Sequence, residues 1–273
     1  MTYSTVMVYV DAADAPERRV RLAAGVADKF NATLIGMSAL AIRPAFVTDD
    51  ALVQDLMQSD IKEMRGKLAD RGSWFRAIAA ADHRKLEWRA VLDFPNAALA
   101  CEARGADLVV IGRTAIPGDS YSTLAPGGAL LKIGRPALVV PDGIGALRAD
   151  HVVIGWKDTR EARRAVVDAL PFLREASRVT VVEICESGEE FAAQEHIDDV
   201  ARFLSRHRIG DGPRVVIHQE GSGAAQLIRL AQDEGADLIV AGAYGHSRLG
   251  EWMFGGMTRD LLATSPLCCV MSH

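Results

Sequence analysis

The chain carries one pattern twice, and this repeat constrains its fold more than any other feature. Gly105-Ala106-Asp107-Leu108-Val109-Val110-Ile111-Gly112 recurs as Gly235-Ala236-Asp237-Leu238-Ile239-Val240-Ala241-Gly242, at an offset of 130 residues (235 − 105). Near the start of each copy, 6–11 matches 152–157 at an offset of 146 residues (152 − 6). The first copy therefore holds 16 extra residues (146 − 130), which we expect within 41–72. Such self-similarity indicates two copies of one structural unit.

The two copies meet in a short connector that is rich in turn-forming residues. Its sequence is Pro141-Asp142-Gly143-Ile144-Gly145, and proline and glycine clusters of this kind mark loops between folded units. The 273 residues suit two domains of roughly 135 residues each. We therefore expect one domain at 1–141 and a second at 148–273.

Each copy alternates apolar, β-branched runs with helical patterns. In the first copy we expect strands at 5–10, 33–38, 86–91, 108–112 and 137–140, and helices at 17–30, 50–71, 97–104 and 128–133. In the second we expect strands at 151–155, 178–184, 214–218, 238–241 and 267–271, and helices at 161–173, 189–206, 224–232 and 256–263. This alternation predicts parallel sheets covered on both faces, joined by right-handed crossovers. The expected fold is α/β, with two tandem doubly wound domains packed as an internal pseudo-dimer.

Composition narrows the classes of function. The formal net charge is −5, from 31 Lys+Arg against 36 Asp+Glu, which argues against a general nucleic-acid binder. No run reaches the roughly 20 apolar residues that span a bilayer, and the N-terminus lacks a secretory signal pattern, so we expect a cytoplasmic protein without membrane contact. We interpret the four cysteines as reduced thiols of the core. The histidines show no metal-ligand spacing, and we interpret His196 as part of a solvated acidic helix.

The most informative loop follows the fourth strand of the second copy. Gly242-Ala243-Tyr244-Gly245 is followed, nine residues later, by Gly255-Gly256-Met257-Thr258, where a helix is expected to begin. Glycine permits positive φ and close backbone approach. A helix N-terminus offers unpaired N–H groups and a positive dipole end, which together suit an anion. We expect Thr258 to add a hydroxyl donor to a phosphate group. The alternative is a turn that serves only close helix packing.

The spacing G-x2-G-x9-G, followed by a small residue, resembles the universal stress protein family. The whole chain is similar to the tandem members of that family, which carry two such domains. The resemblance implies a five-stranded parallel sheet in the order 3-2-1-4-5 in each half. It also implies a loop at which some members bind ATP, with Mg²⁺ accompanying the nucleotide, and at which others do not.

The resemblance carries over unevenly to the glycine loop. Gly242, Gly245 and Gly255 match the three glycines of the family pattern. Gly256 stands where ATP-binding members usually have serine or threonine, which removes a side-chain donor and keeps the backbone N–H. His246, which follows Gly245 directly, either contacts phosphate or caps the loop.

The first strand of each copy supplies the other candidates. The family's acidic residue that contacts the nucleoside aligns with Asp11 in the first copy. In the second copy Lys157 stands there, with Asp158 beside it. Lys157 either meets a phosphate as a point charge or is a solvated lysine. Trp156 either forms a wall of a nucleoside pocket or packs in the core.

The corresponding loop of the first copy is degraded. Gly112 is retained, but Ala115 and Ala125 replace the other two glycines in ungapped register, and Pro117 and Pro126 intervene. Proline has no backbone N–H and fixes φ. We therefore expect the first half not to bind a nucleotide in the family manner. It would serve as a structural partner or hold another ligand.

These features favour a stress-response sensor or regulator that binds a nucleotide through its second domain. An alternative is an interaction scaffold without a small ligand, or a binder of another small or lipidic ligand. A slow ATPase or nucleotidyltransferase is a further alternative, although no G-x-x-x-x-G-K-[ST] loop is present. The least favoured is a phospho-acceptor domain built on Asp11, Asp14 and Asp93. Besides the internal pseudo-dimer, a homodimer through the last strand stays open, and no protein partner can be named.

Overall fold

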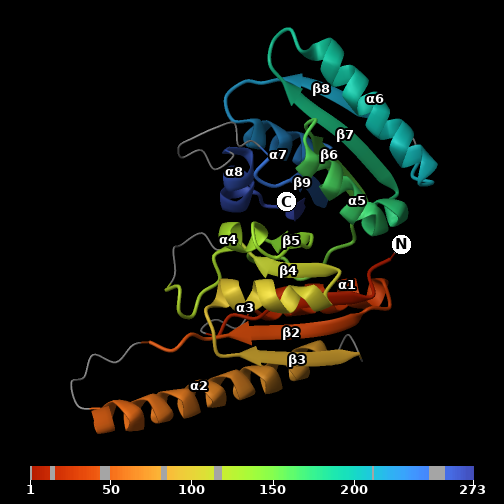
Figure 1. The fold of residues 1–273 in the computed structure, drawn as a ribbon. Helices are drawn as coiled ribbons and strands as arrows, with labels where there is room; N and C mark the ends of the chain where they lie inside the picture. The colour runs from red at the N-terminus through yellow and green to blue at the C-terminus, as the bar shows by residue number, and fades with distance from the viewer. Residues whose placement is uncertain are drawn as a thin grey trace.

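The computed structural model describes residues 2–12, 16–43, 50–80, 85–113, 119–210, 212–245 and 256–273. Within these residues, ten strands form one sheet in the order β3-β2-β1-β4-β5-β10-β9-β6-β7-β8 (Figure 1). The first five strands and the last five each have the local order 3-2-1-4-5. The predicted fold of two doubly wound halves is therefore confirmed.

The bounds of the elements follow the predicted alternation. The first half contains β1 (Thr5–Tyr9), α1 (Glu17–Lys29), β2 (Thr33–Ala39), α2 (Asp50–Ala79), β3 (Leu86–Val91), α3 (Pro95–Glu102), η1 (Ala103–Gly105), β4 (Leu108–Gly112), α4 (Pro126–Leu130) and β5 (Ala137–Val140). The second half contains β6 (His151–Trp156), α5 (Arg160–Glu175), β7 (Arg178–Cys185), α6 (Glu190–Arg206), β8 (Arg214–His218), α7 (Gly223–Asp233), β9 (Leu238–Gly242), α8 (Gly256–Thr264) and β10 (Cys268–Ser272).

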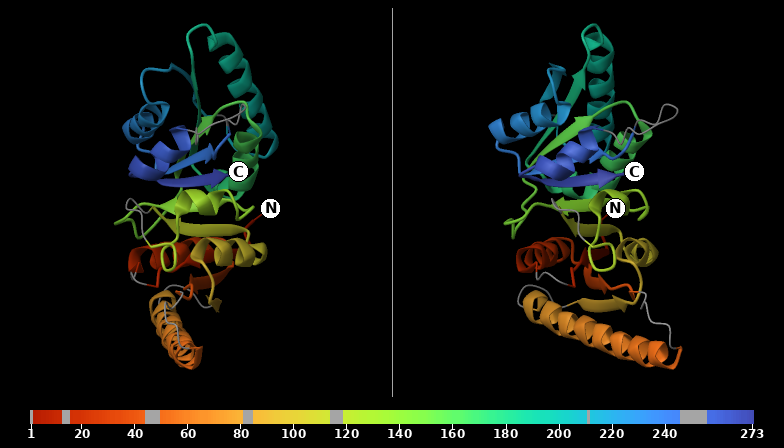
Figure 2. Two further views of the ribbon diagram at one scale, coloured as in Figure 1. Left: turned by 60° about the vertical axis from the view of Figure 1, so that its left-hand side comes forward. Right: turned by 90° about the vertical axis from the view of Figure 1, so that its left-hand side faces the viewer.

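Helices cover both faces of the sheet. One apolar cluster joins the sheet to α1, α2, α5 and α6, and a second cluster joins the other face to α3, α4, α7 and α8. The two views of Figure 2 show these layers on either side of the strands. Strands such as β4 and β10 are buried along their whole length, which explains their continuous apolar sequences.

The two halves join edge to edge. Strands pair in parallel within each half, whereas β5 and β10 pair antiparallel, with Cys269 opposite Val139. A cluster of three aromatic rings crosses the join, since Phe172 of α5 lies 5.5 Å from Tyr3 and 5.2 Å from Phe30, measured between ring centroids. The chain is thus an internal pseudo-dimer, and its last strand already has a partner on each side.

The extra residues of the first half lie where they were expected. Helix α2 has 30 residues, whereas α6, its counterpart in the second half, has 17. In Figures 1 and 2 the amino-terminal part of α2 runs past the ends of the neighbouring strands. Within the described residues, no helix combines the length and apolar character needed to cross a membrane.

The aspartate of the repeated Gly-Ala-Asp motif has a structural role in both halves. Asp107 accepts hydrogen bonds from the backbone N–H groups of Ser4 and Thr5, at 2.8 and 3.0 Å. Asp237 does the same for Asp150 and His151, at 3.3 and 3.2 Å. The repeated aspartate therefore fixes the start of the first strand against the fourth strand, at the end of the sheet opposite to the glycine loop.

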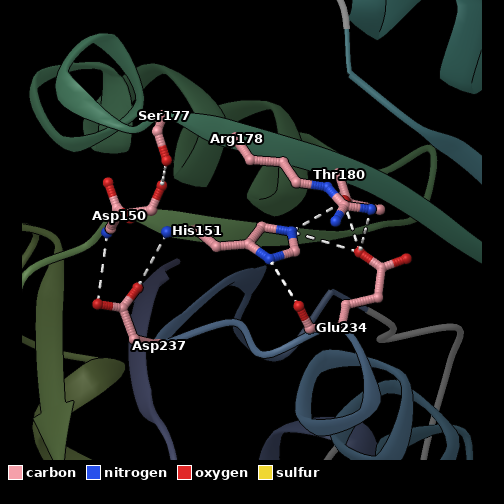
Figure 3. Close-up of polar contacts among 7 residues, drawn as sticks. All are labelled: Asp150, His151, Ser177, Arg178, Thr180, Glu234 and Asp237. Carbon is pink, nitrogen blue, oxygen red and sulfur yellow. Dashed lines mark hydrogen bonds and ion pairs between the residues drawn. The ribbon is translucent and has the colours of Figure 1, made fainter.

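Figure 3 shows how His151 extends this network in the second half. Its Nδ1 donates to the backbone oxygen of Glu234 at 3.1 Å, and its Nε2 lies 3.1 Å from the Thr180 hydroxyl. The Thr180 hydroxyl donates to the Glu234 carboxylate at 2.8 Å, and Arg178 approaches the same carboxylate at 3.3 Å. These contacts connect β6 and β7 to the end of α7.

The prediction of four core thiols is wrong for Cys101, which lies exposed on α3. Cys185, Cys268 and Cys269 are buried. Burial raises the pKa of Cys268 to about 12 and that of Cys269 to about 11, and it also raises the pKa of Cys185. The thiolate is the reactive form of cysteine. Burial therefore protects these three thiols from reagents in two ways, because it blocks access to them and keeps them protonated.

We therefore expect a chromogenic disulfide reagent at pH 8 to modify one thiol per native chain quickly and all four in denaturant. Absorbance of the released chromophore measures both numbers. The Cys101→Ser variant should lose the rapid phase and retain three thiols in denaturant. Rapid modification of a second thiol in the native protein would contradict the burial described here.

Candidate functional site

A cavity of about 490 Å³ lies at the carboxyl ends of the strands in the second half. It opens where β6 has β7 on one side and β9 on the other, so that the chain leaves these strands toward opposite faces of the sheet. Open α/β sheets bind ligands at this kind of switch point. The amino end of α8 and the loop after β9 form one wall, and residues from β7, from α7 and from the chain just after β7 and β8 form the other.

The structure brings most of the predicted binding residues to this cavity. Those that line it are Trp156, Lys157, Gly242, Gly245, Gly256, Met257 and Thr258. Asp158 is not among the lining residues of this cavity, and its carboxylate pairs with Arg163 at 2.5 Å. Predicted residues that lie outside the described ranges are Asp14, Ala115, Pro117, His246 and Gly255.

Part of the glycine loop is already engaged by the protein. The N–H of Ala243 donates to the Ser272 backbone oxygen at 2.7 Å, and the N–H of Tyr244 donates to the Thr258 hydroxyl oxygen at 2.9 Å. Thr258 is 2% exposed. Its hydroxyl oxygen therefore holds the loop against α8, and donation by its O–H to a phosphate group stays a prediction.

Other amides of the loop have no described acceptor. Gly256 and Met257 open α8, where the first N–H groups lack a carbonyl one turn back within the helix. Both residues line the cavity, and no described residue accepts a hydrogen bond from either N–H. The cavity therefore meets the positive end of a helix of nine residues.

The glycines serve close packing rather than a left-handed backbone. Neither Gly242 nor Gly245 has a positive φ, whereas Tyr244, between them, has a φ of 59°. A Cβ on Gly242 would lie 2.6 Å from the backbone nitrogen of Ala162. A Cβ on Gly245 would lie 3.0 Å from a carboxylate oxygen of Glu161. Both glycines let the loop approach the amino end of α5.

Lys157 supplies positive charge at the mouth of the cavity. Its side chain is about half exposed, and its ammonium group lies 3.8 Å from the carboxylate of Glu189. Glu186 also lines the cavity, after the end of β7. At half exposure the pair with Glu189 is weak, so the lysine can turn toward an anion at little cost.

A buried carboxylate lies behind the loop. Glu161 is 4% exposed and pairs with Arg160. Burial acts to raise the pKa of Glu161, but hydrogen bonds from Arg160 and from its own backbone N–H, with the charges of Arg160 and His273, hold that pKa below its usual value. The ionised carboxylate is therefore neutralised locally and does not set the sign of the field in the cavity.

Sequence reasoning missed the polar residues on the opposite wall. Glu186 and Gln219 follow β7 and β8, and Thr159 caps α5 by accepting from the Ala162 N–H at 3.2 Å. The signal was available, because the carboxyl ends of neighbouring parallel strands meet at one edge. The prediction rested on the loops after the first and fourth strands alone.

The equivalent place in the first half is filled by an arginine. Arg19 of α1 pairs with Asp11 at 3.0 Å and donates to the Tyr9 backbone oxygen at 3.3 Å. Its guanidinium packs directly over Gly112. Asp11 and Gly112 are thus brought close together, as the repeat implies, but by a side chain of the protein itself.

Residues 150–272 match the model of the universal stress protein family. No curated protein sequence matches the chain. Among solved structures, a universal stress protein from Archaeoglobus fulgidus DSM 4304 is 14% identical with a TM-score of 0.67, and the match covers 98% of this chain and 95% of that one. A putative universal stress protein from Pseudomonas aeruginosa UCBPP-PA14 is 15% identical with a TM-score of 0.58, over 99% and 93% of the two chains.

A functionally unknown protein from Pseudomonas aeruginosa PAO1 is similar to the same degree, with 14% identity and a TM-score of 0.58 over 99% of this chain and 92% of that one. Identities this low compare the folds alone, and they extend the likeness over both halves. The second half of the chain therefore matches the universal stress protein family, and over its full length the chain has the fold of solved universal stress protein structures of similar size.

Proposed function

We propose that the chain binds ATP or a closely related nucleotide, with Mg²⁺, in the cavity of its second half. The protein would act as a ligand-dependent sensor or regulator in a stress response. The observation that carries this proposal is the convergence of Lys157 with the amino end of α8 on one cavity. A lysine and the amino end of a helix together favour a phosphate chain.

The other wall suits the base of a nucleotide. Val182, Ile184 and Leu227 offer apolar surface, and Glu186 and Gln219 stand at the strand ends with side chains that can hydrogen-bond to ring edges. Binding sites for small molecules commonly combine such apolar walls with a few placed polar groups.

Regulation fits the cavity better than turnover does. Phosphoryl transfer needs several groups that stabilise charge on the moving phosphorus. Among the described residues that line the cavity, Lys157 has the only cationic side chain. A ligand held there would instead stabilise the second half by mass action, which changes the population of its folded state.

We expect ATP with Mg²⁺ at about ten times its dissociation constant to stabilise the protein by about 1.4 kcal/mol. This corresponds to a rise of roughly 2–5 °C in melting temperature for a chain of this size. Gly245→Val should abolish the rise, because its side chain would displace the loop from Glu161 and Thr159. Differential scanning fluorimetry measures both results.

Lys157→Glu provides a second variant that leaves the backbone of the loop unchanged. It should weaken ATP binding about tenfold or more, since a repulsive charge replaces an attractive one. Lys85→Glu is the matched control, because Lys85 precedes β3 at the far end of the sheet. An unchanged melting curve at millimolar ATP, or equal weakening by the two variants, would refute the proposed site.

A further inference from the structure

The glycine loop of the second half reaches across the join to the first half. A Cβ on Gly127 would lie 2.5 Å from the hydroxyl oxygen of Tyr244 and 3.8 Å from the side chain of Leu262 in α8. Gly127 belongs to α4, which contacts α8 where the two halves meet (Figure 1). Tyr244 packs against the apolar cluster on this face of the sheet and does not line the cavity proposed for the nucleotide. The loop after β9 therefore turns its glycines to the cavity and its tyrosine to the first half.

Tyr244 has a backbone conformation that favours glycine. Its φ of 59° lies in the left-handed region, where the Cβ of other residues is crowded by the backbone. A residue in such a conformation persists only where the surrounding structure holds it there. Glycine at this position would form the same turn without that cost. We therefore infer that the tyrosine side chain serves the loop through its contacts with the first half.

The backbone beside Tyr244 is tied to both walls of the join. The N–H of Tyr244 donates to the hydroxyl of Thr258 at 2.9 Å, and Thr258 lines the cavity. The N–H of Ala243 donates to the Ser272 oxygen at 2.7 Å, and the Ala243 oxygen accepts from Nδ1 of His273 at 3.0 Å. The rings of His273 and Tyr244 lie edge to face, with 6.3 Å between their centroids. A displacement of the tyrosine is therefore passed to the residues that flank the cavity.

The surface that receives Tyr244 is itself held in place. Asn96 of α3 accepts from the Ala125 N–H at 2.9 Å and donates to the Ala125 oxygen at 2.8 Å, directly before α4 begins. Gly127 is the second residue of that helix, and its lack of a side chain lets the tyrosine hydroxyl approach the helix closely. The first half thus offers a fixed surface on which the loop of the second half rests.

We propose, on the basis of the nucleotide site proposed above, that Tyr244 is a positioning residue. It fixes the glycine loop against α4 and acts through Gly242 and Gly245, which line the cavity. The affinity of the second half for a nucleotide then depends on a residue of the first half. This dependence gives a role to the first half, in which Arg19 fills the place that corresponds to the cavity.

Gly127→Ala tests this dependence from the far side of the join. Gly127 has no positive φ, so its backbone accepts alanine, but the new methyl group would displace the Tyr244 hydroxyl. We expect the dissociation constant for ATP with Mg²⁺, measured by isothermal titration calorimetry on the full chain, to rise about three- to tenfold. Gly25→Ala is the matched control, since Gly25 lies exposed on α1 and a Cβ there meets no atom within 4 Å. It should leave the dissociation constant unchanged.

Tyr244→Phe separates positioning from a general defect in α4. It keeps the ring and removes the oxygen that the new methyl group meets. The double variant Gly127→Ala/Tyr244→Phe should therefore bind ATP about as tightly as Tyr244→Phe alone. A defect confined to α4 would weaken binding by the same factor in both backgrounds, and that result would overturn the proposal. Equal dissociation constants for Gly127→Ala and the wild type would also overturn it, while the nucleotide site itself would stand.

A second readout needs no nucleotide. In the ligand-free chain, the amide NMR signals of Gly242 and Gly245 should shift in Gly127→Ala and stay in place in Gly25→Ala. The shift should be much smaller when Gly127→Ala is added to Tyr244→Phe. If the wild-type chain bound no ATP, the nucleotide proposal would fail, and these signals would still decide whether Tyr244 positions the loop. Unshifted signals in Gly127→Ala would overturn the positioning role whether or not ATP binds.

Discussion

Replacing Phe172 by alanine is expected to lower the free energy of unfolding by about 3–5 kcal/mol. The ring is fully buried, and its edge-to-face contacts reach Tyr3 and Phe30 in the other half of the chain. Truncation would leave a cavity that neither half can close alone, because the three rings come from separate segments, before β1, after α1 and within α5. Urea denaturation followed by circular dichroism measures the loss.

The matched control is Phe191→Ala. Phe191 lies on α6 and is 78% exposed, so its removal should change the stability by no more than about 0.5 kcal/mol. If Phe172→Ala and Phe191→Ala had the same urea midpoint, the aromatic cluster could not be what joins the halves.

Gly242→Ala is expected to destabilise the chain by about 1–3 kcal/mol. Its new methyl group would lie 2.6 Å from the Ala162 nitrogen and 2.8 Å from the Glu161 carbonyl carbon. Both are backbone atoms of α5, so relief requires a shift of the helix against β9 rather than a side-chain rotation. The free energy of unfolding from urea titration reports this cost.

Gly256→Ala tests whether the effect comes from close packing. A Cβ on Gly256 meets no atom within 4 Å, and alanine favours a helix over glycine by about 0.5–1 kcal/mol. This variant should therefore be as stable as the wild type or more stable. A loss equal to that of Gly242→Ala would show that the loop tolerates no side chain anywhere, and the packing explanation would fail.

The sequence predicted the fold well, because the fold depends on features that repeat along the chain. Buried parallel strands require continuous apolar runs, and these runs are visible without any knowledge of contacts. Element ends were less certain. The predicted helix 50–71 ended before Gly72, because glycine commonly follows the last residue of a helix. In the structure α2 continues to Ala79. Gly72 is needed because a Cβ there would meet the Trp88 ring at 2.6 Å.

The predicted helix at 128–133 shows a similar error. Helix α4 begins at Pro126, where proline suits the first helical position. The prediction treated this proline as an interruption of the loop, and it placed the start of the helix at the glycines that follow. The local sequence allowed either interpretation, and the position of Asn96, which holds Ala125 through two hydrogen bonds, decided between them.

The location of the site was predictable, while the roles of its residues were not. Strand order alone places the loops after β6 and β9 side by side. The engagement of Thr258 by Tyr244, and that of Asp11 by Arg19, depend on side chains packed from different elements. No local pattern carries that information. Residue identity therefore predicted where the cavity lies better than it predicted which groups are free within it.

The antiparallel pairing of β5 with β10 limits how this chain can assemble further. It uses the inner backbone edge of each half, so that β3 and β8 are the terminal strands of the described sheet. A second molecule therefore cannot add to the last strand. Any growth of the sheet between molecules has to start at an outer strand, and unlike pairing of β3 with β8 would repeat without closure and produce an open-ended ribbon.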